Sequence, residues 1–559
     1  MIVDEWKKRV NEVLTNLGVA KPEAAFEHPA ELAHGDYSTN AALVSAKELK
    51  LTPRVLAEKI VAVLRENPIK EVAKIEIAGA GFINFYLSTE FLAREVDGIL
   101  KQGEDFGRQN IGKKKKVLVE FSSPNIAKPF TIGHLRSTII GDAVAKILSF
   151  LGFAVSRDNH LGDWGTQFGK LIVAIKKWGG MNEIAKSPAP VRKLVDLYVR
   201  FHTEAKKDPE LEDEARQWFV KLEQGEREAR SLWEQCVTWS LKEFETLYTR
   251  LGVAFDTAYG ESFYEDKITT VVRELEEKKL LRESEGARLV FFPDEVLPPL
   301  MILKKDGATL YATRDLATDR WRKKEYGDDL VIVNETGTEQ SLYFKQLFMV
   351  EEMLGWFRRG ERVHIGHGLT RGKEGKMSTR EGTAIWLEEV LDEAVKRAAT
   401  INPETAEAVG IGALKFNDLK REARQDIVFD WDEILNLKGD SGPYLQYSYA
   451  RARSVLKKAE ELEVQPQVGK EVEPREPTIL ERLLYRFPEV VERAGREYEP
   501  HFITTYLTEL AGEFNNWYAH NRILDAGDEA PYRVTLAEAF ATVMKNGLTL
   551  LGIPVLEKM

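Results

Sequence analysis

A lysine, a glycine and a histidine stand where a predicted loop enters a predicted helix, a position at which protein chains bind phosphate. The apolar run at residues 117–121 predicts a strand, the loop after it contains Lys128, and residues 131–134 read Thr-Ile-Gly-His. Free N–H groups and the positive end of the helix dipole favour an anion there. Gly133 lets a nucleotide approach the backbone closely, His134 can donate to a phosphate oxygen, and Lys128 supplies a positive charge.

A second lysine suited to phosphate chemistry lies in a glycine-flanked segment much later in the chain. Residues 372–382 read Gly-Lys-Glu-Gly-Lys-Met-Ser-Thr-Arg-Glu-Gly, and the glycines on both sides predict a mobile loop. When a nucleophile attacks a nucleotide phosphate, negative charge builds on the phosphate group that leaves. Lys376, with Lys128 and His134, can stabilise that charge together with the magnesium ion that accompanies a nucleotide.

A second segment, His-Ile-Gly-His at residues 364–367, repeats the Ile-Gly-His of residues 132–134. It ends nine residues before Lys376. Gly-Leu-Thr-Arg-Gly follows it instead of a helical pattern. Because the phosphate site requires the N-terminus of the first helix of the sheet, we assign the role to residues 131–134 and not to this copy. The alternative is a metal site on the two histidines of the copy. Only Glu361 offers a carboxylate close before them and no thiolate is near, so we predict no metal site.

Both phosphate segments resemble the signatures of the class I aminoacyl-tRNA synthetases. Residues 131–134 resemble the His-x-Gly-His signature, residues 376–380 resemble the Lys-Met-Ser-Lys-Ser loop, and residues 122–142 resemble the arginine-specific family as a block. The resemblance implies three catalytic residues: Lys128, His134 and Lys376. It implies an ATP site made by Thr131, Gly133, His134, Lys376, Met377 and Ser378. Thr131 replaces the first histidine of the signature; it can hydrogen-bond to phosphate but carries no charge, so its role stays open.

An enzyme specific for arginine must hold a guanidinium group with five N–H donors, which requires carboxylates and amide oxygens in a fixed array. The family's arginine-contacting positions match Glu120, Asn125, Tyr311, Asp315 and Gln340. Residues 159–169, which read Asn-His-Leu-Gly-Asp-Trp-Gly-Thr-Gln-Phe-Gly, also resemble the arginine-specific pattern. We expect His160 and Gln167 to line the arginine site and Asp163 to brace it.

Two further segments resemble parts of the family that bind tRNA. Residues 442–453 mix aromatic side chains with arginines at helical spacing, a surface that can stack bases and hold phosphates. They resemble the start of a helical anticodon-binding domain, which implies contacts by Tyr447, Arg451 and the terminal Met559. Residues 34–41 and 79–84 resemble the N-terminal domain of the arginine-specific enzymes, which meets the outer corner of tRNA. The implied contacts there are Phe82 and Asn84.

The order of predicted elements indicates an α/β class I fold with three parts. Strand, loop and helix at residues 117–148 predict the opening of a doubly wound Rossmann sheet. We expect an N-terminal α+β domain at residues 1–110, a Rossmann catalytic domain at residues 111–440 and an all-helical anticodon-binding bundle at residues 441–559.

Two stretches of the chain complete this outline. Charge-dense helical patterns at about residues 180–290 predict an insertion in the catalytic domain. Strands of the same sheet are then expected at residues 288–292, 301–303 and 330–333. Helical periodicity predicts the helices of the bundle at residues 455–462, 479–494, 502–517 and 536–551.

The composition is that of a globular protein, with 43% hydrophobic and 30% charged residues. The single cysteine, Cys236, excludes an internal disulfide and a multi-thiolate zinc site. Acidic residues precede any apolar stretch at the start, and no apolar run approaches the ~20 residues that span a bilayer. We therefore expect a cytoplasmic protein with no membrane partner. A net charge of −11 alone argues against a nucleic-acid partner, but a local basic face can coexist with it.

The resemblance implies that L-arginine and ATP, the latter entering with Mg²⁺ as a substrate, form arginyl-adenylate. Arginine then passes to the 3′-terminal adenosine of tRNA(Arg). It further implies that tRNA must bind before activation, that no permanently bound cofactor exists, and that the chain is a monomer. Two alternatives remain. A class I synthetase for another amino acid is disfavoured by Glu120 and Asp315. A tRNA-binding protein without catalysis is disfavoured by Lys128, His134 and Lys376.

Overall fold

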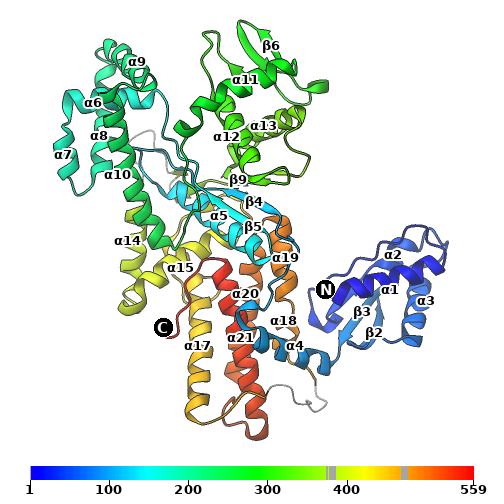
Figure 1. The fold of residues 1–559 in the computed structure, drawn as a ribbon. Coiled ribbons are helices and arrows are strands. Elements are labelled where there is room, and N and C mark those ends of the chain that lie inside the picture. Colours follow the sequence, from blue (N-terminus) through cyan, green and yellow to red (C-terminus); the bar gives the residue numbers. More distant parts are fainter. Residues whose placement is uncertain (1, 373–374, 377–384, 468–475) are drawn as a thin grey trace.

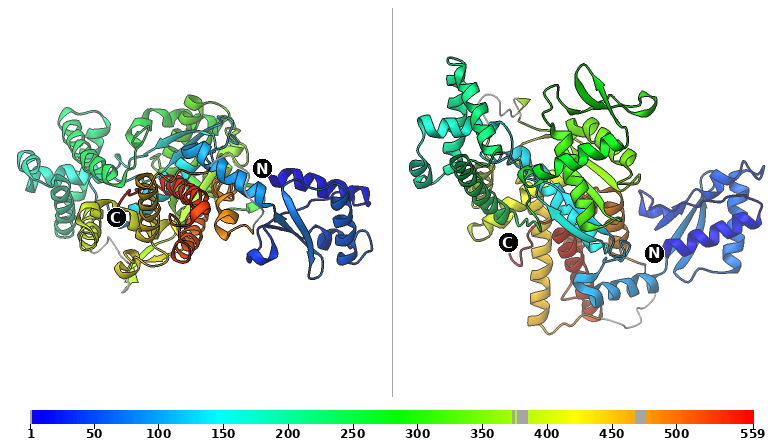
Figure 2. Two further views of the ribbon diagram at one scale, coloured as in Figure 1. Left: turned by 90° about the horizontal axis from the view of Figure 1, so that it is seen from below. Right: turned by 45° about the horizontal axis from the view of Figure 1, so that its top comes forward.

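The structure is a computed structural model that describes residues 2–372, 375–376, 385–467 and 476–559, with the backbone alone described at residues 375–376. Figure 1 shows a central sheet, a helical arm formed by α6 to α10, a helical bundle below the sheet and an N-terminal unit to its right. The N-terminal unit stands apart in both further views (Figure 2). The expected fold class is confirmed: α/β at the centre, α+β at the N-terminus and all-helical at the C-terminus.

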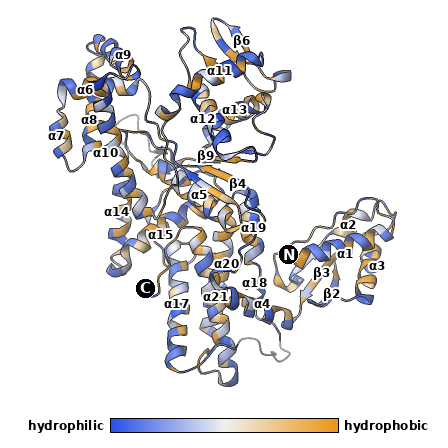
Figure 3. Cartoon of the chain, viewed as in Figure 1, coloured by the Kyte–Doolittle hydropathy of each residue, from blue (hydrophilic) through white to orange (hydrophobic). Residues whose placement is uncertain are grey.

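Four parallel strands form the central sheet in the order β10 (Arg362–His367), β9 (Val331–Gly337), β4 (Lys116–Glu120) and β5 (Ala154–Asp158). Successive residues of β4 enter two different hydrophobic cores, with Val117 and Val119 on one face and Leu118 on the other. Such apolar runs, orange in Figure 3, are typical of parallel strands with both faces covered.

Helix α5 (Ile132–Phe150) follows β4 and covers one face of the sheet. Gly141 lies so close to β4 that an added Cβ would stand 2.2 Å from the Cβ of Phe121. The sequence predicts this helix, and the structure buries it on nearly all sides, including Arg136 and Asp142. A helix enclosed in this way has no solvent face.

Two of the three strands expected to continue the central sheet form a separate sheet instead. It consists of β6 (Leu281–Ser284), β7 (Ala287–Val290) and β8 (Leu300–Leu303), all antiparallel. The expectation was therefore wrong for residues 288–292 and 301–303, and only β9 joins the central sheet. The physical reason is local: Gly286, at a φ of +84°, turns the chain so that β7 pairs back onto β6.

The stretch at about residues 180–290, for which an insertion is predicted, is largely helical. Five helices form the arm at the upper left of Figure 1: α6 (Gln167–Trp178), α7 (Met181–Lys186), α8 (Pro190–Ala205), α9 (Glu210–Glu223) and α10 (Arg227–Leu251). Helix α11 (Ile268–Glu277) lies outside the arm, near β6. The other helices of the central part are α12 (Tyr311–Tyr326), α13 (Ser341–Leu354), α14 (Leu387–Ala398), α15 (Ala406–Leu419) and α16 (Trp431–Ile434). None of the described helices is long and apolar enough to cross a membrane.

The N-terminal unit has a hydrophobic core of its own. Its sheet has the order β1 (Tyr37–Thr39), β3 (Phe82–Leu87), β2 (Val72–Ala78), and its helices are α1 (Ile2–Asn16), α2 (Ala41–Ser45) and α3 (Pro53–Glu66). Trp6 stacks on Phe85 with ring centroids 5.5 Å apart at the centre of that core. Helix α4 (Thr89–Gln102) leads out of the unit toward the C-terminal helices, where Lys545 pairs with Glu104 at 2.6 Å.

The C-terminal bundle consists of α17 (Gly442–Glu461), α18 (Ile479–Leu484), α19 (Phe487–Glu497), α20 (His501–His520) and α21 (Ala530–Leu550). The periodic stretch at residues 479–494 forms two helices and not one. Pro488 lies in the first turn of α19, where a proline is tolerated, whereas inside a continuous helix it would break the hydrogen bonding.

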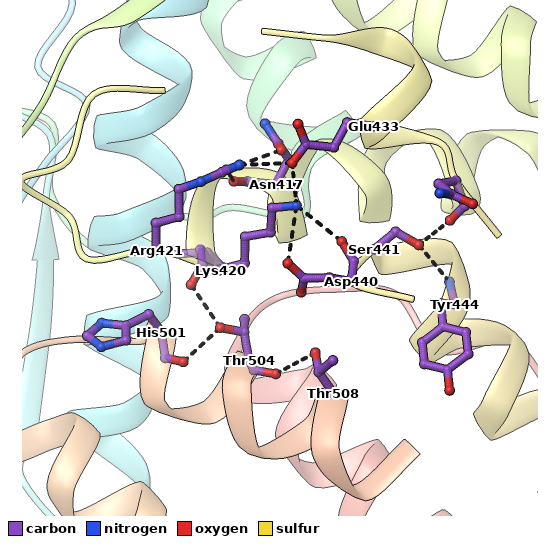
Figure 4. Close-up of polar contacts among 12 residues, drawn as sticks. Asn417, Lys420, Arg421, Glu433, Asp440, Ser441, Tyr444, His501, Thr504 and Thr508 are labelled. Carbon is purple, nitrogen blue, oxygen red and sulfur yellow. Dashed lines mark hydrogen bonds and ion pairs between the residues drawn. The ribbon is translucent and has the colours of Figure 1, made fainter. Parts of the chain in front are cut away.

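Polar side chains join the bundle to the central part (Figure 4). Lys420, which follows α15, lies 2.8 Å from Glu433 and 3.4 Å from Asp440. The residue after Asp440 is the helix cap Ser441, whose hydroxyl accepts from the backbone N–H of Tyr444 at 3.2 Å. Thr504 of α20 donates to the carbonyl oxygen of Leu419 at 3.0 Å. The end of α15 therefore sets the start of α17 and the position of α20.

Candidate functional site

A cleft with a volume of about 1040 Å³ opens at the carboxyl ends of β4 and β9. Ligands of open parallel sheets bind at this edge. The six positions expected to bind arginine all line the cleft: Glu120, Asn125, His160, Tyr311, Asp315 and Gln340. Lys128 and Gln167 line it as well, whereas Tyr311 is 70% exposed at its mouth. The fold thus brings together residues that lie far apart in the sequence.

The loop between β4 and α5 is held in an unusual backbone conformation. Three residues other than glycine have positive φ: Ser122 at 70°, Ser123 at 44° and Ala127 at 56°. Their backbone N–H groups donate respectively to Ser137 Oγ, Asn159 Oδ1 and Ser240 Oγ at 2.9, 3.2 and 2.9 Å. Such conformations cost about 1–3 kcal/mol each and persist where the surroundings enforce them. Here they fix the turn that brings Lys128 to the cleft.

His134 lies in the first turn of α5 and is bound by the residue that caps the helix. Nδ1 of His134 accepts from the backbone N–H of Thr131 at 3.0 Å and lies 3.1 Å from its hydroxyl. Nε2 therefore carries the proton of the neutral ring. Burial, with smaller contributions from the charges of His367 and Lys128, lowers the pKa of His134 to about 4. His134 is a neutral hydrogen-bond donor near pH 7, and Gly133 beside it is exposed.

Glu120 is not an unpaired carboxylate, because Arg322 of the same chain binds it. Nη1 of Arg322 lies 2.6 Å from Glu120 and 3.1 Å from Asp319, and Nη2 contacts Asp158. Burial acts to raise the pKa of Glu120, but Arg322 outweighs it and the pKa falls below its usual value. Sequence reasoning missed Arg322 and Asp319. The available signal was spacing, since both follow Asp315 on one face of α12.

Arg362 of β10 extends this network of charges on the side of the sheet. It lies 2.8 Å from Asp319 and 3.2 Å from Glu351, and it donates to the amide oxygen of Asn334 at 3.0 Å. Burial raises the pKa of Glu351 well above its usual value, and the charge of Arg362 opposes that effect. Buried guanidinium and carboxylate groups therefore neutralise one another in this part of the site.

Asp315 differs, because no cationic side chain pairs with it among the described residues. Its carboxylate accepts a hydrogen bond from the hydroxyl of Tyr343, which sequence reasoning also missed. Burial raises the pKa of Asp315 to about 7, while the neighbouring His160 acts in the opposite direction. A desolvated carboxylate without a counter-ion is stabilised by a bound cation. Asp315 is therefore the part of the cleft best suited to receive one.

Two glycines allow the wall of the cleft to close around polar groups. A Cβ at Gly162 would stand 2.3 Å from Asn125 Oδ1, and a Cβ at Gly260 would stand 2.2 Å from the carboxylate of Asp163. Asp163 accepts from the backbone N–H of Ser262 at 2.8 Å and from its hydroxyl at 2.6 Å. Asp163 thus ties the loop that carries His160 to Ser262.

Three possible metal ligands also meet beside the cleft. Glu120, Asp158 and His160 each have a ligand atom within 4.8 Å of the others. The guanidinium of Arg322 contacts both carboxylates, however, and a metal ion would have to displace it. This set therefore does not fit a resident metal.

The literal histidine motif on β10 divides into two different environments. His364 Nε2 lies 2.9 Å from the hydroxyl of Thr336, and the ring stacks on Phe344 with centroids 4.5 Å apart. His367 instead contacts Glu335 at 2.7 Å and lies near enough to His134 for its charge to lower the pKa of that ring. The ends of the two motifs are linked through the next residues, because Arg136 donates from Nη1 to the carbonyl oxygen of Gly368 at 2.9 Å.

The second signature is described only in part. Lys376 ends β12 (Gly375–Lys376), of which the backbone is described, and the expected ATP contacts Met377 and Ser378 lie outside the described residues. Strand β12 pairs with β11 (Thr370–Gly372), which pairs in turn with β13 (Ile427–Val428). The stem that carries Lys376 therefore continues directly from β10.

The three positions matched to anticodon contacts converge on one groove of about 670 Å³ in the bundle. Tyr447, Arg451 and Met559 line it. The guanidinium of Arg451 lies 4.7 Å from the ring centroid of Tyr447 and 5.0 Å from that of Tyr518. Sequence reasoning missed Tyr518 and Lys558, which also line the groove. Aromatic faces and cations side by side suit unpaired bases and phosphates.

The two N-terminal positions differ in exposure. Phe82 is 40% exposed at the start of β3, whereas Asn84 is 4% exposed and accepts from the hydroxyl of Ser38 at 2.8 Å. The expectation that Asn84 touches a partner directly does not agree with this burial. Its side chain instead joins β3 to β1 beneath the surface.

Profiles of three protein families match consecutive stretches of the chain. They describe the arginyl tRNA synthetase N terminal domain at residues 4–87, the catalytic domain of tRNA synthetases class I (R) at residues 95–431, and the DALR anticodon binding domain at residues 445–559. The catalytic profile alone covers more than half of the chain. Together with the parallel sheet and its cleft, it defines a class I tRNA synthetase.

Whole-chain relatives narrow the class further. The arginine–tRNA ligases of Clostridium acetobutylicum and Fusobacterium nucleatum are 41% and 42% identical, over 99% and 100% of this chain and 100% and 99% of theirs. The structure of Thermus thermophilus arginyl-tRNA synthetase matches with a TM-score of 0.83 at 25% identity, covering 100% of both chains. That of the Plasmodium falciparum arginyl-tRNA synthetase has the same fold, with a TM-score of 0.83 at 24% identity over 100% of this chain and 99% of that one. The chain belongs to the arginyl-tRNA synthetase family.

Proposed function

We propose that this chain uses ATP to join L-arginine to tRNA(Arg). In the first step the carboxylate of arginine attacks the α-phosphate of ATP, which gives arginyl-adenylate and pyrophosphate. In the second step the 2′-hydroxyl of the terminal adenosine attacks the carbonyl carbon of the adenylate, and AMP leaves. Family membership over the whole chain and the acidic cleft at the edge of the sheet both support this proposal.

The observation that carries the choice of arginine is the carboxylate of Asp315. It lies in the cleft, it is desolvated, and no described cation pairs with it. A guanidinium group fits this need, because it is permanently charged and presents donors in a plane to a carboxylate. Around it, the cleft offers further polar partners for arginine: Glu120, Asn125, His160, Tyr311 and Gln340.

Activation in this proposal depends on hydrogen-bond donors and charge at the start of α5. Nε2–H of His134 donates to a phosphate oxygen, Gly133 leaves room for the polyphosphate, and Lys128 approaches it from the loop. Burial lowers the pKa of Lys128, and Glu261 opposes that effect. By family resemblance, Thr131 and the segment of Lys376, Met377 and Ser378 complete the ATP site. ATP enters with Mg²⁺, which belongs to the substrate and helps to neutralise the polyphosphate.

Recognition of tRNA is assigned to the two ends of the chain. The proposed division is an N-terminal domain at residues 1–110, a catalytic domain at residues 111–440 and an anticodon-binding bundle at residues 441–559. Exposed Phe82 meets the outer corner of tRNA. The groove of Tyr447, Arg451 and Met559 receives the anticodon loop. We further propose that the chain acts as a monomer in the cytoplasm, where its tRNA substrate occurs.

Pyrophosphate exchange tests the proposal directly. We expect the intact chain to exchange pyrophosphate into ATP with arginine and with no other standard amino acid, and only when tRNA is present. His134→Ala should reduce adenylate formation about 10²–10³-fold, because it removes a donor that acts on charge developing in the transition state. Arginine binding to that variant should change little. Exchange with a different amino acid would refute the assignment of substrate, and a fully active His134→Ala would refute the ATP site.

A further inference from the structure

The signature at residues 131–134 contains no charged side chain in this protein. Position 131 is a threonine, and both its hydroxyl and its backbone N–H lie against Nδ1 of His134. Thr131 therefore orients His134 and caps the helix. His134 itself is neutral near pH 7, since burial lowers its pKa to about 4. The signature thus offers phosphate one neutral imidazole where the family pattern has two histidines.

A second imidazole reaches the same place from strand β10. Arg136, half a turn beyond His134 in α5, donates from Nη1 to the carbonyl oxygens of Gly368 and Gln425 at 2.9 and 2.8 Å. Gly368 is the residue after His367, so this bond anchors the end of β10 to the first turns of α5. The charge of His367 consequently acts on His134 and contributes to lowering its pKa.

A buried carboxylate orients His367 and favours its charged form. Nδ1 of His367 lies 2.7 Å from Oε1 of Glu335 on β9, whose side chain is fully buried. Burial alone would lower the pKa of His367, but Glu335 outweighs it and the pKa is raised. With Nδ1–H directed at Glu335, Nε2 has no hydrogen-bond partner among the described residues. The charged ring therefore keeps one N–H donor for a ligand.

We propose that His367 binds the polyphosphate of ATP through Nε2–H and supplies the imidazole that the signature lacks at position 131. The inference rests on the proposed function and adds a residue to its ATP site. His134 acts as the neutral donor and His367 as the charged one. Strand β10 leads through β11 toward the backbone of β12, so His367 lies on the stretch of chain that precedes Lys376, which family resemblance assigns to the ATP site.

The groups that surround His367 determine how its charge responds to pH. They are Glu335 on β9, Glu339 after β9, Arg136 and His134 on α5, Asp418 on α15 and His364 on β10. Burial lowers the pKa of His364, and it raises the pKa of Asp418 to about 6 against the effect of Arg136. The two neighbouring histidines therefore lose their protons at lower pH than His367 does. Above pH 7, ATP binding should weaken as the His367 proton is lost.

The test compares His367→Gln with the matched variant His364→Gln, three residues earlier on the same strand. Glutamine can still donate to Glu335 but carries no charge. Loss of a charge-assisted hydrogen bond should raise the KM for ATP about tenfold at pH 7, with the KM for arginine changed by less than about twofold. His364→Gln should raise the KM for ATP by no more than about twofold, because His364 bonds to Thr336 and stacks on Phe344.

The ratio of the KM for ATP of His367→Gln to that of the unchanged chain should fall toward one as pH rises from 7 to 9. Equal effects of the two variants, or a ratio independent of pH, would overturn the proposal. Glu335→Gln retains His367 but removes the charge that raises its pKa, so the pH dependence of the KM for ATP should move to lower pH. An unchanged pH dependence would also overturn the proposal. Arginine binding measured by calorimetry shows that each variant is folded. Failure of the proposed function is distinct, because the unchanged chain would then show no arginine-dependent exchange.

Discussion

Two acidic groups of one cleft have opposite electrostatic surroundings. Glu120, at the end of β4, is bound by Arg322 and has a lowered pKa. Asp315, on α12, accepts a hydrogen bond from the hydroxyl of Tyr343, and its pKa is raised to about 7. Both positions match the family's arginine contacts, yet only Asp315 lacks a cation within the described chain. A carboxylate that the protein has already paired is part of the framework, whereas a carboxylate left without a cation is a binding group.

The largest expected effect comes from removing Arg322, the cation that pairs with Glu120. Arg322→Met should lower the free energy of unfolding by about 3–5 kcal/mol, because it leaves buried carboxylates without their cation. The matched control is Arg320→Met on the same helix. The side chain of Arg320 is 41% exposed and pairs with Glu274. An exposed pair of that kind contributes about 0–1 kcal/mol. Denaturant unfolding of both variants measures the difference, and similar losses would contradict the framework role of Arg322.

A change at Asp315, the carboxylate without a cation, should weaken arginine binding and leave the stability of the fold largely unchanged. Asp315→Asn removes the charge offered to the guanidinium, and loss of a buried charged partner costs about 2–5 kcal/mol. The KM for arginine should therefore rise at least ~30-fold. Asp306→Asn, at another acidic residue of the cleft lining, serves as the control. An unchanged KM for arginine in Asp315→Asn would remove Asp315 from the arginine site.

The raised pKa of Asp315 predicts a pH dependence of a definite sign. A carboxyl with a pKa of about 7 is mostly protonated at pH 6 and mostly ionised at pH 8. Since only the ionised form attracts a guanidinium, the KM for arginine should fall about tenfold over that interval. The KM of Asp315→Asn should show no such fall. Arginine remains charged throughout, so a KM that rises with pH would contradict the assignment.

The smallest effect should come from Tyr343, which holds the unpaired carboxylate. Tyr343→Phe removes one hydrogen bond, worth about 0.5–1.5 kcal/mol, and should raise the KM for arginine roughly threefold. The same bond lowers the pKa of Asp315, so its loss should move the pH dependence of arginine binding upward. A purely structural role for Tyr343 would leave that pH dependence in place.

The sequence could predict the part of the site that depends on local pattern. The apolar run, the loop and the helix at residues 117–148 identify the edge of the sheet at which the cleft opens. The spacing of Tyr311 and Asp315 places both on one face of α12. Strands at residues 288–292 and 301–303 could be recognised but not assigned to a sheet, because a short apolar run does not specify its partner.

What the sequence could not show depends on contacts between distant segments. Arg322 on α12 reaches Glu120 on β4 and Asp158 on β5, and no local pattern links these residues. The motif at residues 364–367 was set aside because no helix follows it. That criterion is sound for the helix N-terminus, but it cannot reveal that β10 ends beside α5, where His367 acts on His134.

The separate core of the N-terminal unit has a consequence for how the protein unfolds. The cores on both faces of the central sheet share its strands, and one of them continues into the C-terminal helices. The N-terminal core is distinct, and Tyr485 is its one buried hydrophobic member from beyond residue 92 in the described chain. The polar contacts of this unit with α18 and α19 include Arg482 to Asp36 at 2.7 Å and Tyr37 to Glu489 at 2.6 Å. Heating should therefore melt the chain in two calorimetric transitions, each with its own free energy of unfolding, and the loss expected for Arg322→Met belongs to the transition of the central part.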